Sequence, residues 1–304
     1  MSYLFYCPQM AEIARSIAAA VPGIRLGRID WRDFEDGFPN LKIHDAELLR
    51  NAGVFFLAAF DSPGEIFKQL SVIYDLPRLS IRDLTVILPF YPTGTMERVE
   101  QEGEIATAAT LARMLSATPL SKSGPLQVIV YDIHALSERF YFSDRVIPRL
   151  ESAMAILKER IKTMDNMAIA FPDEGAWKRF RGMLGEYPII ICHKVRMDKD
   201  RIITIKEGDP AGKHVIIVDD LIMTGGTILQ CKKALSDHGA RRVSAYATHG
   251  VFPGDSWNRF INAGFHKLWI TDSCPRQAAR LSVVAPFEIL SLAPAISEII
   301  KKEG

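Results

Sequence analysis

The chain has 304 residues, of which 48% are hydrophobic and 24% are charged, and its formal net charge is +1. This composition excludes disordered and fibrous proteins, and the near-neutral charge gives no reason to expect binding to nucleic acid. At roughly 150 residues per domain, the length favours two domains, each with its own core.

The cysteine pattern and the apolar runs favour a reduced compartment and exclude a transmembrane protein. The four cysteines show no CxxC spacing, and no apolar run reaches about 18 residues. The first residues carry no basic segment ahead of an apolar run, so we expect a cytoplasmic protein without a membrane anchor. An organellar form that has lost a transit peptide remains an alternative.

Short apolar runs alternate with amphipathic segments of helical length in the first half of the chain. The expected strands are residues 3–7, 53–60, 84–90 and 126–133, and the expected helices are 10–20, 63–76 and 103–115. Because the strands are apolar throughout, they predict a parallel sheet that helices cover on both faces. We therefore expect an α/β domain over residues 1–146.

The same alternation continues through the second half. A helix is expected at 146–161, and the segments after it comprise strands at 166–171, 187–195, 201–207, 214–220, 243–250 and 267–273 and helices at 175–184, 227–240 and 256–264. This pattern predicts a second α/β domain over residues 147–289. A terminal helix at 290–304 is expected to pack on the first domain.

The stretch HVIIVDDLIMTGGTIL, residues 214–229, has the features of a ligand site. A buried strand would deliver Asp219 and Asp220 at its carboxyl end, where open α/β sheets bind ligands. The loop that follows leads into a helix expected to begin near Ile228, and its backbone N–H groups and the helix N-terminus can bind an anion. This loop consists of Thr224, Gly225, Gly226 and Thr227.

Paired carboxylates beside such a loop can hold the two vicinal hydroxyls of a ribose, directly or through Mg²⁺. The alternative is that Asp219 and Asp220 cap a helix and that the loop is a plain turn. The stretch resembles the phosphoribosyl pyrophosphate (PRPP) signature that type I phosphoribosyltransferases share with ribose-phosphate pyrophosphokinases.

Three further segments favour the second family, and so does the presence of two α/β halves. The segments are YDIHALSERFYF, FPDEGAWKRF and HKVRMDKDR. Over nearly its whole length the chain is similar to the plant-type, class II ribose-phosphate pyrophosphokinases. The resemblance implies two type I phosphoribosyltransferase-like domains, each a mostly parallel sheet flanked by helices.

The resemblance also implies an activity and its substrates. The family transfers the β,γ-pyrophosphoryl group of ATP to the 1-hydroxyl of ribose 5-phosphate in the presence of Mg²⁺, and forms PRPP and AMP. We expect a homo-oligomer whose donor can include other nucleoside triphosphates. Two alternatives stay open: a phosphoribosyltransferase that consumes PRPP, and a non-catalytic regulatory subunit associated with a synthetase.

Two residues are candidates for the metal site. His134 follows the strand at 126–133 and should lie at the carboxyl edge of a sheet, although a core histidine bonded to backbone is an alternative. Asp173 precedes Gly175 and could be a simple turn aspartate. In the family, the matching residues contact Mg²⁺, and the histidine also contacts the nucleotide phosphates.

Lys194 and Arg196 are the candidates for transition-state stabilisation. Their i, i+2 spacing places both on one face of an extended segment, which most often means a solvated basic face. Here they precede the polar stretch MDKDR, typical of a mobile hairpin, and they match the catalytic Lys and Arg of the family's flexible loop. Such a loop would supply positive charge to the transferred phosphoryl group.

The expected nucleotide site contains both matches to the family and departures from it. Phe34 and Asp36 match the aromatic and acidic members of the loop that contacts adenine. Phe38 stands where class I enzymes have Glu. Glu97 and Arg98, from the stretch PFYPTGTMER, are assigned to the same site.

Other departures follow the class II pattern. Thr95 and Met96 replace the Arg-Gln pair that holds the base in class I enzymes, and Met223 replaces an acidic residue of the phosphate loop. In the family, this pattern is associated with use of a broader range of donor nucleotides and with loss of activation by phosphate.

Overall fold

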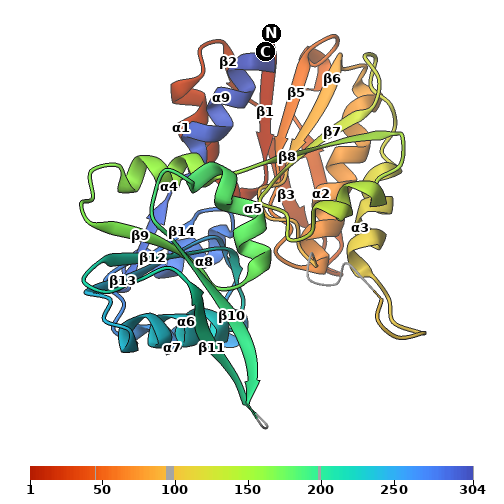
Figure 1. Cartoon of the computed structure of the whole chain (residues 1–304). Coiled ribbons are helices and arrows are strands. Elements are labelled where there is room, and N and C mark those ends of the chain that lie inside the picture. The colour runs from red at the N-terminus through yellow and green to blue at the C-terminus, as the bar shows by residue number, and fades with distance from the viewer. Residues whose placement is uncertain (45, 94–98, 198–199, 304) are drawn as a thin grey trace. The chain divides into compact units, whose positions relative to one another are not determined.

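The computed structural model describes residues 1–44, 46–93, 99–197 and 200–303, and only the backbone within 194–202. The chain forms two compact units (Figure 1). Unit 1 comprises Met1–Ser152 and Ser291–Gly304, and unit 2 comprises Ala153–Leu290.

Unit 1 contains, within the described residues, a six-stranded sheet in the order β2-β1-β5-β6-β7-β8, and all its neighbours pair in parallel. The strands are β1 (Ser2–Tyr6), β2 (Ile24–Leu26), β5 (Gly53–Leu57), β6 (Asp83–Ile87), β7 (Leu126–Tyr131) and β8 (Val146–Glu151). The helices are α1 (Ala11–Ala20), α2 (Pro63–Asp75), α3 (Thr107–Ser116) and α9 (Ala293–Glu303). The parallel α/β architecture expected for the first half is confirmed.

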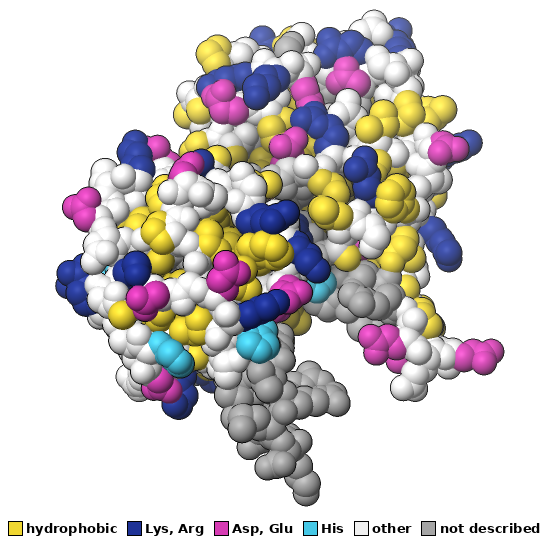
Figure 2. Space-filling view, in the orientation of Figure 1, with side chains coloured by type: hydrophobic (Ala, Val, Ile, Leu, Met, Phe, Trp, Pro, Cys, Tyr) yellow, Lys and Arg dark blue, Asp and Glu magenta, His cyan; other side chains and the backbone are white. Residues whose placement is uncertain are grey.

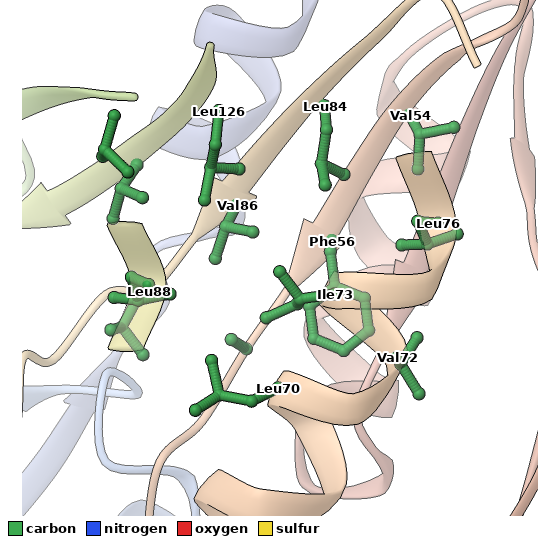
Figure 3. Close-up of a cluster of buried hydrophobic side chains, with 14 of the residues drawn as sticks. Val54, Phe56, Leu70, Val72, Ile73, Leu76, Leu84, Val86, Leu88 and Leu126 are labelled. Atoms are coloured by element: carbon green, nitrogen blue, oxygen red, sulfur yellow. The ribbon is translucent and has the colours of Figure 1, made fainter. Parts of the chain in front are cut away.

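The helices of unit 1 cover both faces of its sheet. Figure 1 shows α1 and α9 together on one face, and α2 and α3 on the other. Apolar side chains of α2 lie against the inner strands, as Leu70 and Ile73 do beside Phe56 in Figure 3. The helix begins where Ser62 Oγ accepts a hydrogen bond from the Glu65 N–H at 3.3 Å.

The prediction of a helix at 146–161 is wrong for the first half of that range. Val146–Glu151 forms β8, which pairs with β7 alone at the edge of the sheet, and α4 (Met154–Ile161) follows it. Pro148 is compatible with this position, because an edge strand tolerates a residue that lacks an N–H.

A two-stranded antiparallel hairpin was not expected from the sequence. It pairs β3 (Ile29–Asp33) with β4 (Pro39–Ile43), and its turn carries residues 34–38. The hairpin is fixed to the rest of unit 1 by Trp31, which packs against Phe56, and by an ion pair of 2.8 Å between Asp33 and Lys68 of α2.

Unit 2 contains, in the part of the chain described, a seven-stranded sheet in the order β11-β10-β9-β12-β13-β14-β15. The strands are β9 (Met167–Phe171), β10 (Ile189–Met197), β11 (Asp200–Glu207), β12 (His214–Ile222), β13 (Arg242–Gly250), β14 (Leu268–Thr271) and β15 (Phe287–Leu290). Its helices after α4 are α5 (Glu174–Leu184), α6 (Gly226–Asp237), α7 (Asn258–Ile261) and α8 (Pro275–Leu281). β10 and β11 pair antiparallel, and the other neighbours pair in parallel.

The surface carries charged side chains of both signs. On the face drawn in Figure 2, Lys and Arg side chains are interspersed with Asp and Glu. Among the residues described, no helix is long and apolar enough to cross a bilayer.

Candidate functional site

The phosphate loop joins β12 to α6 in unit 2. β12 ends at Ile222 and α6 begins at Gly226, two residues before the expected start. Gly225 precedes the helix in the left-handed conformation, with φ of 78°, and no described side chain caps the helix. The N–H groups of the first turn are therefore available to an anion, as the strand-loop-helix pattern predicts.

The two glycines of the loop have different surroundings. A Cβ atom on Gly225 would lie 2.2 Å from Phe260 Cζ, whereas one on Gly226 would meet no heavy atom within 4 Å. Gly225 is therefore required by the fold itself, because of both its φ and the ring beneath it. Gly226 leaves open space beside the helix N-terminus.

Replacing Gly225 by alanine is expected to destabilise unit 2 by about 2–6 kcal/mol, since a left-handed residue and an overpacked contact cost about 1–3 kcal/mol each. Urea denaturation would measure the loss. Gly226→Ala is the matched control and should keep the wild-type free energy of unfolding to within about 1 kcal/mol. Equal stability of both variants would contradict the contact with Phe260.

Hydrogen bonds from the segment around α7 hold the phosphate loop in place. Ser256 Oγ donates to the carbonyl oxygen of Met223 at 3.1 Å, and Arg259 Nη1 donates to that of Thr224 at 2.7 Å. Neither contact could be predicted, because Ser256 and Arg259 lie more than 30 positions further along the chain. They hold the loop backbone in place without using the side chains of the predicted phosphate site.

The paired carboxylates lie at the carboxyl end of β12. Asp219 Oδ1 accepts the N–H of Asp220 at 3.0 Å, and Asp220 Oδ1 accepts the N–H of Leu221 at 2.7 Å. Neither carboxylate caps α6, which begins only at Gly226. Burial, followed by the charges of Asp220 and Asp173, raises the pKa of Asp219 well above its ordinary value.

Asp173 follows β9, the strand that pairs with β12 in the sheet. Its Oδ1 accepts the N–H of Ala176 at 3.0 Å, which makes Asp173 the N-cap of α5. The residue is thus more than a turn aspartate, since it begins a helix. Because parallel strands end at one edge of a sheet, Asp173 comes near Asp219, and its charge acts on that carboxyl group.

Lys194 and Arg196 both lie on β10, opposite Ile203 and Arg201 of β11. Their side chains lie outside the described part of the structure. β9 pairs with β10 only as far as Ile191, so the segment that carries both residues continues past β9 as a two-stranded ribbon. The expected hairpin is therefore present, with the two cations at alternate positions of one strand.

His134 lies in unit 1, in the loop after β7. Its side chain is exposed, which excludes the core histidine considered above. The loop is held by Glu138, a buried residue whose Oε1 accepts the N–H of Ala135 at 3.0 Å. The sequence did not point to Glu138 as a site residue, because a glutamate in a polar segment is normally exposed.

The predicted nucleotide-binding aromatic lies at the tip of the β3–β4 hairpin. Phe34 and Phe38 are 56% and 65% exposed, although both are large and apolar. Between them, Asp36 Oδ1 accepts the N–H of Phe38 at 3.0 Å. The other residues assigned to the nucleotide site or its departures, Thr95, Met96, Glu97 and Arg98, lie outside the described residues.

The carboxylates of this site could bind a divalent cation, but they do not provide a complete set of ligands. Among the described residues, no group of three His, Cys, Asp or Glu side chains is close enough to hold an ion. Asp173 and Asp219 nevertheless fit a hard cation such as Mg²⁺, because each repels the charge of the other and an oxygen-binding cation would relieve that repulsion. Such a site would take its other ligands from water and substrate.

Two family models match this chain. One describes the N-terminal domain of ribose phosphate pyrophosphokinase and matches residues 2–118. The other describes a phosphoribosyl synthetase-associated domain and matches residues 189–303. Together they cover most of both units.

Among curated proteins, the chain is 51% identical to ribose-phosphate pyrophosphokinase 4 of Arabidopsis thaliana, over 98% of this chain and 91% of that protein. It is also 51% identical to the mitochondrial ribose-phosphate pyrophosphokinase 3 of Spinacia oleracea, over 98% and 76%. The fold matches the crystal structure of phosphoribosylpyrophosphate synthetase from Mycobacterium smegmatis with a TM-score of 0.84 and 25% identity, over 100% of this chain and 99% of that one.

Proposed function

Because the chain belongs to the ribose-phosphate pyrophosphokinase family, we propose that it transfers the β,γ-pyrophosphoryl group of ATP to the 1-hydroxyl of ribose 5-phosphate. The products are PRPP and AMP. The observation that carries this proposal is the loop between β12 and α6, which combines an uncapped helix N-terminus with two carboxylates on the preceding strand.

In this proposal the loop binds ribose 5-phosphate. The N–H groups of Gly225 and Gly226 and the hydroxyls of Thr224 and Thr227 hold the 5-phosphate, because a helix N-terminus favours negative charge. Asp219 and Asp220 accept hydrogen bonds from the ribose hydroxyls. The open space beside Gly226 supports this assignment, since backbone must be reachable for a phosphate to bind it.

The donor nucleotide is assigned to residues of unit 1. Phe34 would stack on the base, and Asp36, Glu97 and Arg98 would complete the nucleotide site. The exposure of Phe34 supports this role, because an apolar ring at a hairpin tip otherwise gains nothing from its position.

The proposed cofactor is Mg²⁺, with His134 and Asp173 as its protein contacts, directly or through water. When bound, the ion neutralises part of the charge on the donor phosphates. Lys194 and Arg196 would act on the transferred group itself, where negative charge develops. No residue is required as a covalent nucleophile, since the 1-hydroxyl attacks the β-phosphorus and AMP leaves.

The test is AMP release by the purified protein given ATP, Mg²⁺ and ribose 5-phosphate, with and without inorganic phosphate. AMP formed in equal amount to PRPP, with no nitrogenous base present, is the expected result. If the protein makes AMP only when PRPP and a nitrogenous base are supplied, it is a phosphoribosyltransferase. A protein inactive alone that stimulates an active homologue would instead be a regulatory subunit.

Donor discrimination is expected to be modest. Strong rejection of a wrong base, by about 10⁴-fold or more, requires buried polar groups that the wrong base leaves unpaired. Phe38 presents no such group where class I enzymes have Glu, so kcat/KM for ATP should exceed that for GTP, CTP or UTP by much less. The Phe38→Glu variant should increase the preference for ATP. A wild-type preference of about 10⁴-fold would contradict this assignment.

Location and assembly are also proposals. We propose a cytoplasmic homo-oligomer, while the relatives named mitochondrial and chloroplastic support an organellar form as the alternative. Cell fractionation would decide the location, and light scattering coupled to gel filtration would give the number of subunits.

A further inference from the structure

An ion pair within unit 2 lies beside the carboxylates of the candidate sugar site. Arg179 Nη1 of α5 lies 3.3 Å from Asp220 Oδ2, and the two side chains are only 15% and 10% exposed. The residues are 41 positions apart, so this pair exists only because α5 packs against β12. Arg179 belongs to the segment FPDEGAWKRF, but neither the resemblance nor local spacing assigns it a role.

The pair is held by rigid surroundings. Ala176 and Phe180 on α5 are buried in the same cluster as Val218, the residue directly before Asp219. The guanidinium of Arg179 also lies 5.1 Å from the centroid of the Phe180 ring. The helix that Asp173 begins therefore carries Arg179 to the end of β12 with little freedom to move.

The two oxygens of Asp220 have different partners. Oδ1 accepts the backbone N–H of Leu221, and Oδ2 faces Arg179. The carboxylate is thus fixed from two sides, and its rotation is restricted before any substrate arrives.

The charges around the site also explain why a buried arginine lies at this place. Asp173, Asp219 and Asp220 bring three carboxylates to one edge of the sheet, and their charges repel. Burying an ion pair costs desolvation and is rarely a gain in stability by itself. A pair placed among repelling carboxylates is better explained by its effect on the site than by its effect on the fold.

We propose that Arg179 is a positioning residue for ribose 5-phosphate, which orients the carboxylate of Asp220 toward a hydroxyl of the sugar. The proposal rests on the proposed function of the loop between β12 and α6. Arg179 acts through Asp220 and does not itself contact the phosphate. It therefore affects affinity for the sugar and leaves the donor site unchanged.

The first test compares ribose 5-phosphate binding, measured by calorimetry, with the steady-state constants of AMP release. Arg179→Met keeps an unbranched apolar side chain in place of the aliphatic part of arginine and removes the guanidinium and its charge. We expect the dissociation constant and KM for ribose 5-phosphate to rise about 10- to 100-fold, the range for loss of one charge-assisted hydrogen bond. KM for ATP should change by less than about threefold.

Two variants control for a purely structural role. Arg179→Lys keeps the charge and should recover part of the affinity, whereas a residue that only fills space would not distinguish Lys from Met. Arg181→Met, on the same helix, removes an exposed arginine that lies 4.5 Å from the ring centroid of Trp177 and should leave all constants unchanged. Unchanged sugar affinity in Arg179→Met, or an equal loss for both substrates, would overturn the proposal.

A double-mutant cycle with Asp220→Asn separates action through Asp220 from direct contact with the substrate. If Arg179 acts through Asp220, adding Arg179→Met to Asp220→Asn should lower sugar affinity by less than about threefold. Losses that multiply would mean that Arg179 binds the phosphate directly, and the positioning role would be wrong.

Calorimetry also separates this proposal from the proposed function. A wild-type protein that binds ribose 5-phosphate but releases no AMP would refute the activity, and the binding constants of the variants would still decide the role of Arg179. A wild-type protein that binds no ribose 5-phosphate would refute both.

Discussion

Replacing Lys194 by alanine is expected to lower kcat by on the order of 10² to 10³, about 3–4 kcal/mol, with ribose 5-phosphate affinity nearly intact. An interaction made only in the transition state lowers kcat and kcat/KM together, whereas a contact to the bound substrate mainly raises KM. The position of Lys194 supports the first case, since the ribbon of β10 and β11 carries it past the end of β9. In the proposed function, this ribbon presents the charge of Lys194 to the transferred group.

The measurement is the full dependence of AMP release on both substrates. Lys233→Ala is the control, because Lys233 is an exposed lysine of the same unit and pairs with Asp237 four residues along α6. It should keep the wild-type constants. If Lys194→Ala retained its kcat and lost only affinity, Lys194 would be a binding residue and its catalytic assignment would be wrong.

Arg196→Ala should show the same pattern as Lys194→Ala. Both residues lie on one strand at i, i+2, so they are expected to act together on the transferred group. The double variant should then lose less activity than the product of the two single losses. Strictly multiplicative losses would mean that the two side chains act independently.

Gly226→Val is expected to reduce ribose 5-phosphate affinity by about 100-fold or more, which corresponds to about 2.7 kcal/mol, while the protein stays folded. Apart from its neighbours in the chain and the nearby backbone of α6, no described heavy atom lies within 4 Å of a Cβ at Gly226, so a side chain can leave the backbone there without a clash. It would occupy the space beside the N-terminus of α6, through which a phosphate must approach the backbone. Calorimetry measures the affinity, and urea denaturation should show an unfolding free energy within about 1 kcal/mol of the wild type.

Gly182→Val is a suitable control, since Gly182 lies on the exposed side of α5 and a Cβ there also meets no atom. Its affinity for ribose 5-phosphate should equal that of the wild type. The result for Gly226→Val also contrasts with Gly225→Ala, which is expected to lose stability because of Phe260. Normal sugar binding by a folded Gly226→Val protein would move the phosphate site away from this loop.

The apolar strands were predictable because a strand that is buried on both faces must be apolar or small throughout. A strand such as β5 is buried on both faces, so every residue from Gly53 to Leu57 must be apolar or small, and the sequence shows this directly. β8 was not predictable by the same pattern. It lies at an edge, is only partly buried, and its apolar residues fit a helical period as well as a strand.

The β3–β4 hairpin was missed for a related reason. Its strands lie outside the main sheet and are mostly half-buried or exposed, so their residues carry no continuous apolar run. Its stability comes from contacts with other parts of unit 1, such as the ion pair between Asp33 and Lys68 of α2.

The sequence by itself determined the parallel α/β architecture, the inner strands of both sheets, and a loop in which Asp219, Asp220 and two glycines follow one strand. These features depend on residues close together in the chain, whose spacing is readable without the fold. Only the tertiary structure decided which glycine the fold requires, that His134 is exposed, and that Arg179 meets Asp220. Phe260 lies beneath Gly225 and Arg179 beside Asp220 because helices pack on the sheet, and contacts between distant segments leave no periodic pattern in the sequence.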